Sequence, residues 1–127
     1  MRPPTALLLI AHGSRRAEAN EDLDHLAEQL RRHHRFDFVQ TSFLELTPPT
    51  IADGGARCVT AGAKRVVMLP YFLSAGVHAR DDMLTAQAEL AARFPEVEFL
   101  LAQPLGRHPL LEEIVSQRAA EAERGGG

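Results

Sequence analysis

Residues 7–16, LLLIAHGSRR, combine an unbroken apolar run with an abrupt change to polar and cationic side chains. A short, continuous apolar run is typical of a strand that is buried on both faces, as in a parallel sheet. Here the run ends at His12, and Gly13, Ser14 and two arginines follow it. We therefore interpret residues 5–11 as a buried strand that carries an imidazole at its carboxyl end.

Along the rest of the chain, further strand-like runs alternate with segments of helical spacing. Further strand-like runs lie at 36–45, 64–72 and 97–104. The segments between and after them have apolar residues at helical spacing, namely Ala19, Leu23, Leu26, Ala27 and Leu30, then Met83, Ala86, Leu90, Ala91 and Phe94, and finally Leu111, Ile114 and Val115. Parallel strands need helical crossovers that cover both faces of the sheet. The pattern predicts an α/β fold, a three-layer α/β/α domain with a four-stranded, mostly parallel sheet.

Local signals mark the ends of two helices. Thr47 and Pro48 are suited to the cap and first position of the second helix, which contains Gly54 and Gly55, although each glycine costs about 1 kcal/mol relative to alanine. His108 precedes Pro109 and is predicted to cap the fourth helix. The tail at about 121–127 is expected to be frayed.

Composition limits the class of protein. The 127 residues are 45% hydrophobic and 24% charged, which fits a single domain over residues 1–127. A net charge of -3 gives no general attraction for nucleic acid, and the N-terminal apolar run is too short to span a membrane. The single cysteine, Cys58, excludes an internal disulfide and fits a small buried residue. We expect a cytoplasmic protein with no nucleic-acid or membrane partner.

Three polar residues follow three of the predicted strands. His12 follows the first strand, Glu45 ends the second and His78 follows the third. Each alone also fits an ordinary polar loop residue. However, the carboxyl ends of parallel strands share one edge of the sheet, where such folds bind ligands. Two imidazoles and a carboxylate are a typical site for iron, cobalt, nickel or zinc.

Four motifs together resemble a known family. The segments AHGSR, FLE, LPYFLSAGVHARDD and PLGRHPLLEEIV are similar to those of the small sirohydrochlorin chelatases, the class II chelatases of the cobalamin and sirohaem pathways, over about residues 6–118. The resemblance implies a homodimer that inserts Co²⁺ or Fe²⁺ into sirohydrochlorin, a tetrapyrrole, with Ni²⁺ also compatible and no permanently bound cofactor. DDMLTA stands where many relatives continue with Ile-Pro, so the start of the third helix is expected to differ.

The resemblance also implies roles for individual residues. His12 and His78 match the catalytic histidines that bind the metal and accept protons, and Glu45 matches the third metal ligand. A histidine with the ordinary pKa of about 6.5 accepts a proton at neutral pH, and a site without a thiolate releases its metal more readily. The cleft that binds the tetrapyrrole is expected to include Ser14, Arg15, Leu73, Ser74, Ala75, Gly76 and Arg80. In this set, arginines pair with carboxylates and apolar residues contact the ring.

Other classes of function fit less well. A histidine phosphatase needs an arginine where Ala11 stands, a serine hydrolase needs GxSxG around Ser14, and a dinucleotide-binding domain needs GxGxxG. A metal-binding or metal-transfer protein without catalytic activity remains an open alternative, because ligands alone do not imply turnover.

Overall fold

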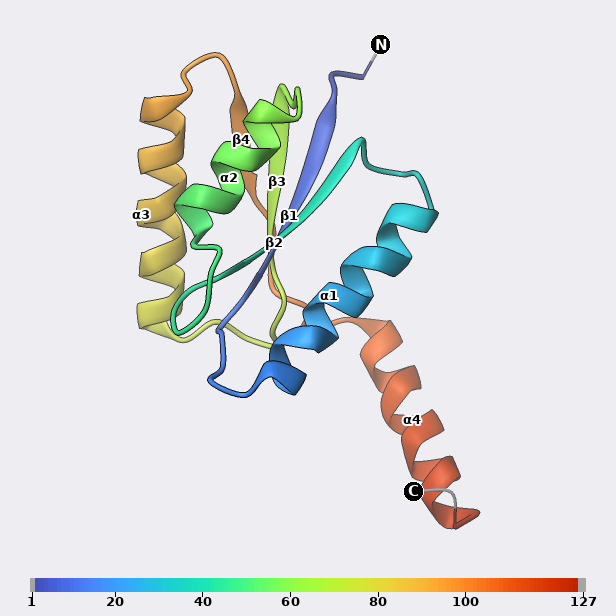
Figure 1. Cartoon of the computed structure of the whole chain (residues 1–127). Helices are drawn as coiled ribbons and strands as arrows, with labels where there is room; N and C mark the ends of the chain where they lie inside the picture. Colours follow the sequence, from blue (N-terminus) through green and yellow to red (C-terminus); the bar gives the residue numbers. More distant parts are fainter. Residues whose placement is uncertain (1, 126–127) are drawn as a thin grey trace.

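The computed structural model describes residues 2–125, in which strands and helices alternate (Figure 1). The elements are β1 (Thr5–Ala11), α1 (Ala17–Arg32), β2 (Phe38–Phe43), α2 (Ile51–Thr60), β3 (Arg65–Pro70), α3 (Val77–Arg93), β4 (Glu98–Leu101) and α4 (Pro109–Glu123). The strands form one sheet in the order β2-β1-β3-β4, and every neighbouring pair is parallel. The predicted α/β class and four-stranded parallel sheet are confirmed.

The central strand β1 explains why its sequence is apolar without interruption. Leu8 and Ile10 belong to a buried cluster on the side of α2 and α3, whereas Leu7 and Leu9 belong to a cluster on the side of α1. All four side chains are at most 2% exposed. Both faces of β1 are therefore covered, and neither face tolerates a polar residue.

The second helix starts later than the sequence pattern suggested. The N-cap is Thr50, whose hydroxyl accepts a hydrogen bond from the Asp53 N–H at 3.1 Å, so the prediction of Thr47 as the cap was wrong. Thr47 and Pro48 lie in the preceding loop, which carries the chain from the edge of the sheet back to its face. Thr47 and Thr50 are both of a residue type that caps helices, and the structure uses Thr50.

Close packing accounts for the two glycines of α2. A Cβ atom at Gly54 would lie 2.9 Å from Leu8 Cδ1 and 3.0 Å from Ser42 Cβ. At Gly55 it would lie 2.7 Å from a methyl group of Leu90 on α3. The glycines therefore allow α2 to approach both the sheet and α3 more closely than alanine would.

The helices do not cover the sheet as evenly as a regular three-layer domain requires. Figure 1 shows α2 and α3 on one side of the sheet, α1 on the other, and α4 extending away from the body. Leu111, Ile114 and Val115 were predicted to face inward, but Ile114 and Val115 are 49% and 67% exposed and no residue of α4 is buried. The tail predicted to be frayed is helical as far as Glu123; Gly126 and Gly127 lie outside the described residues.

Two alanines at the borders of predicted apolar faces are also exposed. Ala19 on α1 and Ala91 on α3 lie outside the core, whereas Leu23, Met83 and Leu90 are buried as predicted. Alanine extends too little from a helix to reach the sheet unless it lies at the centre of the apolar face. The structure instead buries Ala79, in the first turn of α3.

The thiol of Cys58 is fully buried in the core on α2, as predicted for a small apolar residue. Burial raises the pKa of this thiol from 9.0 to about 12, because the thiolate would lose its hydration; a backbone hydrogen bond has a smaller, opposite effect. A thiol with so high a pKa is not a nucleophile at neutral pH. Cys58 therefore has a packing role.

This burial predicts how stability changes at alkaline pH. Below pH 9.0 both folded and unfolded chains keep the thiol proton; between pH 9.0 and about 12 only the unfolded chain loses it. The free energy of unfolding should therefore fall as pH rises, at up to about 1.4 kcal/mol per pH unit from this group. Urea unfolding of the natural protein and of Cys58→Ala, from about pH 8 to pH 11, should show the steeper fall in the natural protein; parallel curves would contradict the assignment.

Candidate active site

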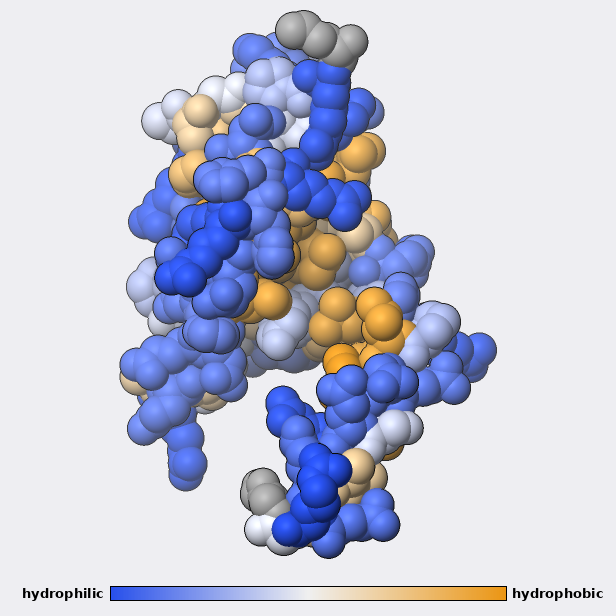
Figure 2. Space-filling view, turned by 90° about the vertical axis from the view of Figure 1, so that its right-hand side faces the viewer, coloured by the Kyte–Doolittle hydropathy of each residue, from blue (hydrophilic) through white to orange (hydrophobic). Residues whose placement is uncertain are grey.

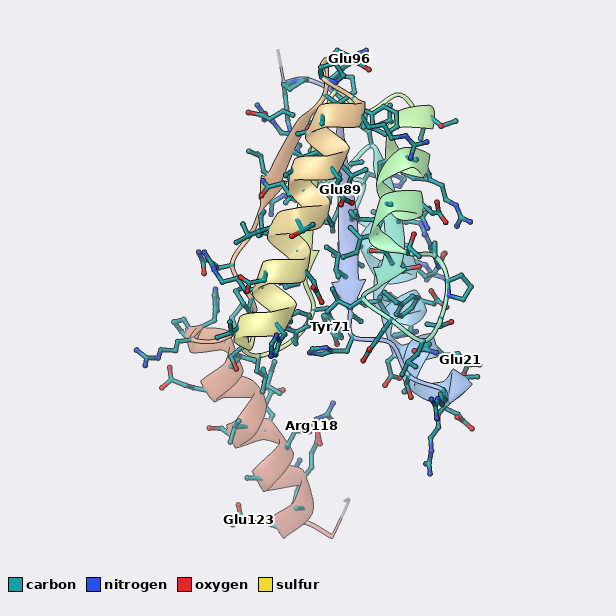
Figure 3. All side chains as sticks on the ribbon, turned by 90° about the vertical axis from the view of Figure 1, so that its left-hand side faces the viewer. Glu21, Tyr71, Glu89, Glu96, Arg118 and Glu123 are labelled. Atoms are coloured by element: carbon teal, nitrogen blue, oxygen red, sulfur yellow. The ribbon has the colours of Figure 1, made fainter. Side chains whose placement is uncertain are left out.

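The carboxyl edge of the sheet brings together loops that are distant in sequence. The Tyr71 N–H, directly after β3, donates to the Ile10 carbonyl at 2.7 Å, and Figure 3 shows Tyr71 at the end of the sheet where α3 begins. Phe72 then stacks on the His12 ring, with centroids 4.5 Å apart and planes inclined by 30°. The loop after β3 therefore packs against the imidazole that follows β1 and restricts its orientation.

The loop after β2 lies directly against the backbone at His12. The Glu45 N–H donates to the His12 carbonyl at 3.1 Å, and the Leu44 N–H donates to the Ala11 carbonyl at 2.9 Å. Gly13, with φ +97°, makes this approach possible, because a Cβ there would collide with the Glu45 carbonyl. Leu46, directly after Glu45, has φ +69°, a strained conformation for leucine. The backbone thus holds Glu45 beside His12.

His78 lies in the first turn of α3, not in a loop after the third strand as the sequence suggested. The helix begins at Val77, and the Arg80 N–H donates to the Gly76 carbonyl at 3.0 Å. A helix start at this point gives His78 and Asp82 the four-residue spacing that places side chains on one helix face. Helix boundaries are the part of a fold that local patterns define least sharply.

One cavity of about 200 Å³ joins the three predicted residues. Its lining consists of His12, Leu44, Glu45, His78, Ala79 and Asp82. The predicted convergence of His12, Glu45 and His78 is therefore a property of the structure. Asp82 was not singled out from the sequence, although its spacing from His78 on a helix would have indicated it.

The four polar side chains of this cavity are not engaged in hydrogen bonds or ion pairs with other described residues, although the His12 ring stacks on Phe72. Within residues 2–125, none of His12, Glu45, His78 and Asp82 makes a side-chain hydrogen bond or ion pair. Nor do any three histidine, cysteine, aspartate or glutamate side chains among these residues lie close enough together to hold a metal ion at once. The metal-ligand set His12, Glu45 and His78 therefore stays a prediction, with its members at one cavity but not preassembled as a closed site.

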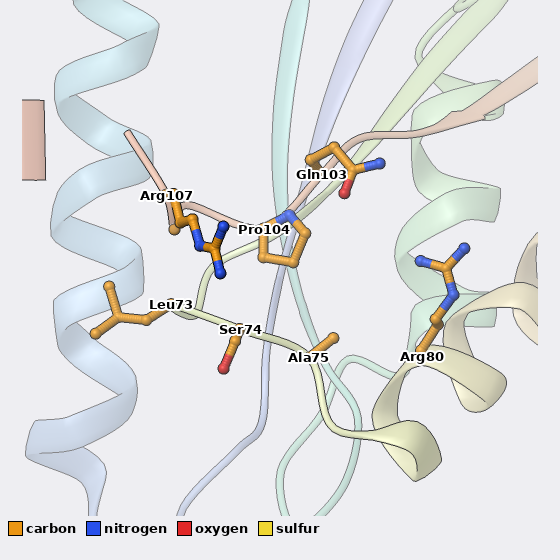
Figure 4. A pocket seen from close by; sticks show the side chains of 8 residues that line it. Leu73, Ser74, Ala75, Arg80, Gln103, Pro104 and Arg107 are labelled. Atoms are coloured by element: carbon orange, nitrogen blue, oxygen red, sulfur yellow. The ribbon is translucent and has the colours of Figure 1, made fainter. Parts of the chain in front are cut away.

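A second cavity, of about 390 Å³, adjoins the first turn of α3. Figure 4 shows Arg80 and Arg107 on opposite sides of it, with Ser74 and Ala75 along one wall and Gln103 and Pro104 along another. Leu73 and Gly106 complete the lining. No acidic residue lines this cavity, so its two guanidinium groups make it attractive to anions.

This cavity includes only part of the predicted substrate-binding set. Leu73, Ser74, Ala75 and Arg80 line it, whereas Gly76 is the N-cap of α3 and lines neither cavity. Arg15 is exposed away from both cavities, and the Ser14 hydroxyl accepts the Arg16 N–H at 3.1 Å, a contact that shapes the start of α1. A substrate-binding role for these three residues stays a prediction.

Sequence reasoning missed the contribution of the loop after β4. The Leu105 N–H donates to the Phe72 carbonyl at 3.0 Å and the Gly106 N–H to the Leu73 carbonyl at 2.9 Å. These bonds hold the 103–107 loop against the 72–75 loop, so that Arg107 faces the same cavity as Arg80. Parallel sheets bind ligands beyond the carboxyl ends of their strands, which is why His12 and His78 were predicted to be site residues. The same reasoning applies to Arg107, because Arg107 also follows a strand of the sheet.

With the geometry known, comparison with known proteins identifies the family. A family model described as CbiX matches residues 6–122. The chain belongs to the CbiX family. This CbiX chain has a fold similar to the crystal structure of the sirohydrochlorin chelatase SirB from Bacillus subtilis subspecies spizizenii in complex with cobalt, with a TM-score of 0.85 and 30% identity. That comparison covers 92% of this chain and 50% of the SirB chain.

Curated relatives of the CbiX chain differ in length. It is 37% identical over 122 residues to the sirohydrochlorin cobaltochelatase of Priestia megaterium and 36% identical over 112 residues to the chloroplastic sirohydrochlorin ferrochelatase of Arabidopsis thaliana. These alignments cover 95% and 88% of this chain but 39% and 50% of the relatives, so the chain spans half of their length or less. The sirohydrochlorin cobaltochelatase of Sulfolobus acidocaldarius, 30% identical, is aligned over 90% of its length and 91% of this chain.

Among the described residues, no helix of the CbiX chain combines the length and apolar composition needed to cross a membrane.

Proposed function

We propose that this protein is a sirohydrochlorin chelatase that inserts a divalent metal ion, Co²⁺ or Fe²⁺, into sirohydrochlorin. The observation that carries the proposal is the convergence of His12, Glu45 and His78, from three distant segments, on one cavity at the carboxyl edge of the sheet. The relatives named as cobaltochelatases and ferrochelatases of sirohydrochlorin support it. The metal is a substrate here, and we propose no permanently bound cofactor.

Metal insertion requires a site that binds the metal ion weakly and groups that accept two protons. Insertion of M²⁺ into the ring replaces two pyrrole N–H protons, so charge balances when both protons leave. The exposed imidazoles of His12 and His78 hold the incoming ion and accept these protons, and Glu45 adds a third ligand and offsets the positive charge. Because no thiolate takes part and the ligands do not form a closed cage, the ion can leave for the ring.

The larger cavity supplies complementary contacts for the tetrapyrrole. Sirohydrochlorin carries several peripheral carboxylates, and Arg80 and Arg107 place two guanidinium groups at opposite sides of a cavity that also has apolar walls. Arginine pairs with carboxylates through two parallel hydrogen bonds. Leu73 and Ala75 contact the ring, and Ser74 supplies a hydroxyl.

Replacement of Arg107 by glutamine should therefore raise the KM for sirohydrochlorin about tenfold, as expected from the loss of one charged hydrogen bond worth about 1.5 kcal/mol. The value of kcat should change little, because Arg107 lies away from the metal cavity. Steady-state kinetics with the tetrapyrrole as the varied substrate would measure both constants. Arg57→Gln, which removes an exposed arginine on α2 that lines neither cavity, is the matched control; equal KM values for the two variants would rule out the role of Arg107.

The test of the proposed function is metal insertion under turnover conditions. Full-length protein is mixed with an excess of sirohydrochlorin and of Co²⁺, Fe²⁺ or Ni²⁺ without oxygen, and the absorbance of the ring is followed. Many insertions per chain above the spontaneous rate support a chelatase. At most one insertion per chain indicates the alternative, a metal-transfer protein, and no insertion with any metal would overturn the proposal.

The proposal extends to assembly and location. We propose a homodimer, in which facing copies enclose the tetrapyrrole, because this chain matches half of the SirB chain and a second copy would supply the equivalent of the other half. We also propose that residues 1–127 act as a single domain and that the protein works in the cytoplasm, where a reduced cysteine such as Cys58 is the usual state.

A further inference from the structure

The side chain of Asn20, the fourth residue of α1, pairs with the backbone of Ser14 through two hydrogen bonds. The Ser14 N–H donates to Asn20 Oδ1 at 3.0 Å, and Asn20 Nδ2 donates to the Ser14 carbonyl at 2.7 Å. One amide therefore satisfies both backbone groups of one residue. Among residues 2–125, no other side chain from outside the 13–16 segment forms a hydrogen bond with it.

The start of α1 lacks the usual side-chain cap. Its N-cap is Arg16, whose side chain makes no capping hydrogen bond. Ser14 is of a residue type that commonly caps helices, but its hydroxyl accepts the Arg16 N–H at 3.1 Å. Asparagine is among the weaker helix formers, so its contact with Ser14 accounts for its presence at position 20. The polar side chains of this segment therefore stabilise the loop before α1.

This loop is the one that follows His12. Only Gly13 lies between His12 and Ser14, and its φ of +97° belongs to the wide conformational range that glycine allows. A hydrogen bond from the Glu45 N–H holds the His12 carbonyl on one side of the chain. The pairing of Ser14 with Asn20 fixes the loop on the other side. The backbone at His12 is therefore held from two directions.

Helix α1 is a fixed base for this contact. Leu23 and Ala27 of α1 are buried against the sheet, whereas the surface on this side of the molecule is largely hydrophilic (Figure 2). Figure 3 shows Glu21, the residue after Asn20, at the same end of the sheet as Tyr71. The Asn20 amide therefore connects a helix that is packed on the sheet with the loop at its carboxyl edge.

We propose that Asn20 is a positioning residue for His12. By holding Ser14 it limits the movement of Gly13 and keeps the His12 imidazole stacked on Phe72 at the metal cavity. Asn20 itself does not line either cavity of the active site. Its role rests on the proposed function only in that His12 takes part in metal insertion. The orientation of the His12 ring can be measured without any reaction.

Proton NMR of the His12 ring tests its orientation directly. Because the ring stacks on Phe72 with centroids 4.5 Å apart, the ring current should shift its carbon-bound proton signals away from those of exposed His25. The His12 signals are identified by their loss in His12→Ala. In Asn20→Ala this shift should shrink, because the ring then samples other orientations. The matched control is Gln29→Ala, which removes another amide from α1, one without a hydrogen bond to the described residues. An unchanged shift in Asn20→Ala would overturn the proposal.

Kinetics separate positioning from a general loss of stability. Asn20→Ala should lower kcat for Co²⁺ insertion by about 10- to 100-fold, as expected when a reacting group is displaced by about 1 Å. The KM for sirohydrochlorin should change little, because the residues of the larger cavity come from other segments. Gly62→Ala places alanine at a φ of +104° in open space and so strains the backbone away from the site. It should keep the natural kcat; an equal fall of kcat in both variants would overturn the role of Asn20.

Asn20→Asp isolates the donor half of the pair. A carboxylate keeps the shape of the amide and accepts the Ser14 N–H, but it cannot donate to the Ser14 carbonyl and repels it. We expect kcat and the His12 signal shift to fall to the values of Asn20→Ala. Natural values of both would overturn the proposal, because the paired hydrogen bonds would then be unnecessary. A changed shift in Asn20→Ala, in a protein that inserts no metal even in its natural form, would refute the proposed function and support the positioning of His12 by Asn20.

Discussion

Replacement of His78 by alanine should lower the rate of Co²⁺ insertion into sirohydrochlorin by at least about 100-fold, the usual effect of removing a proton acceptor from a reaction. The loss is expected to be chemical and not structural. His78 is exposed in the first turn of α3 and makes no side-chain hydrogen bond among the described residues. Alanine also has the higher helix propensity, so the free energy of unfolding should change by less than about 0.5 kcal/mol.

The matched control is His25→Ala, which removes another exposed histidine from a helix, on α1 and outside both cavities. Its insertion rate should equal that of the natural protein. His12→Ala should also abolish insertion, but with some loss of stability, because the imidazole stacks on Phe72. Insertion by the His78→Ala protein at the natural rate, with Co²⁺ at saturating concentration, would remove this residue from the reaction.

Gly13→Ala is expected to destabilise the protein strongly and to abolish activity without removing any functional group. The φ of +97° at Gly13 is unfavourable for alanine by at least about 1–2 kcal/mol. In addition, the new Cβ would collide with the Glu45 carbonyl, a backbone atom that cannot move without displacing Glu45 and the bond from its N–H to the His12 carbonyl. Two of the three predicted metal ligands therefore depend on this glycine.

Gly62 provides a control that separates the two effects. Its φ is +104°, but a Cβ there would have no heavy atom within 4 Å. Gly62→Ala should therefore show the conformational cost alone, with the insertion rate retained. Urea unfolding and metal-insertion kinetics of both variants test this; equal losses of stability would mean that the close approach to Glu45 does not matter.

Much of the site was predictable because strand direction is a strong constraint. Once the apolar runs indicated parallel strands, His12, Glu45 and His78 had to lie at one edge of the sheet, and one cavity contains all three. Arg107 follows the fourth strand and satisfies the same constraint, so its place at this edge was predictable in the same way. Asp82 required knowledge of where α3 begins, which depends on the loop before it.

Periodicity and residue type were sufficient to predict the order of strands and helices and the cap at His108, because these depend on neighbours within a few residues. They also predicted the burial of the central strand and of Cys58, because apolar groups are generally excluded from water. They were not sufficient for the placement of α4. An apolar stripe predicts that a helix will be covered, but it carries no information about which surface will cover it. That choice depends on backbone hydrogen bonds between the 102–106 loop and segments more than thirty residues earlier, which direct α4 away from its own sheet.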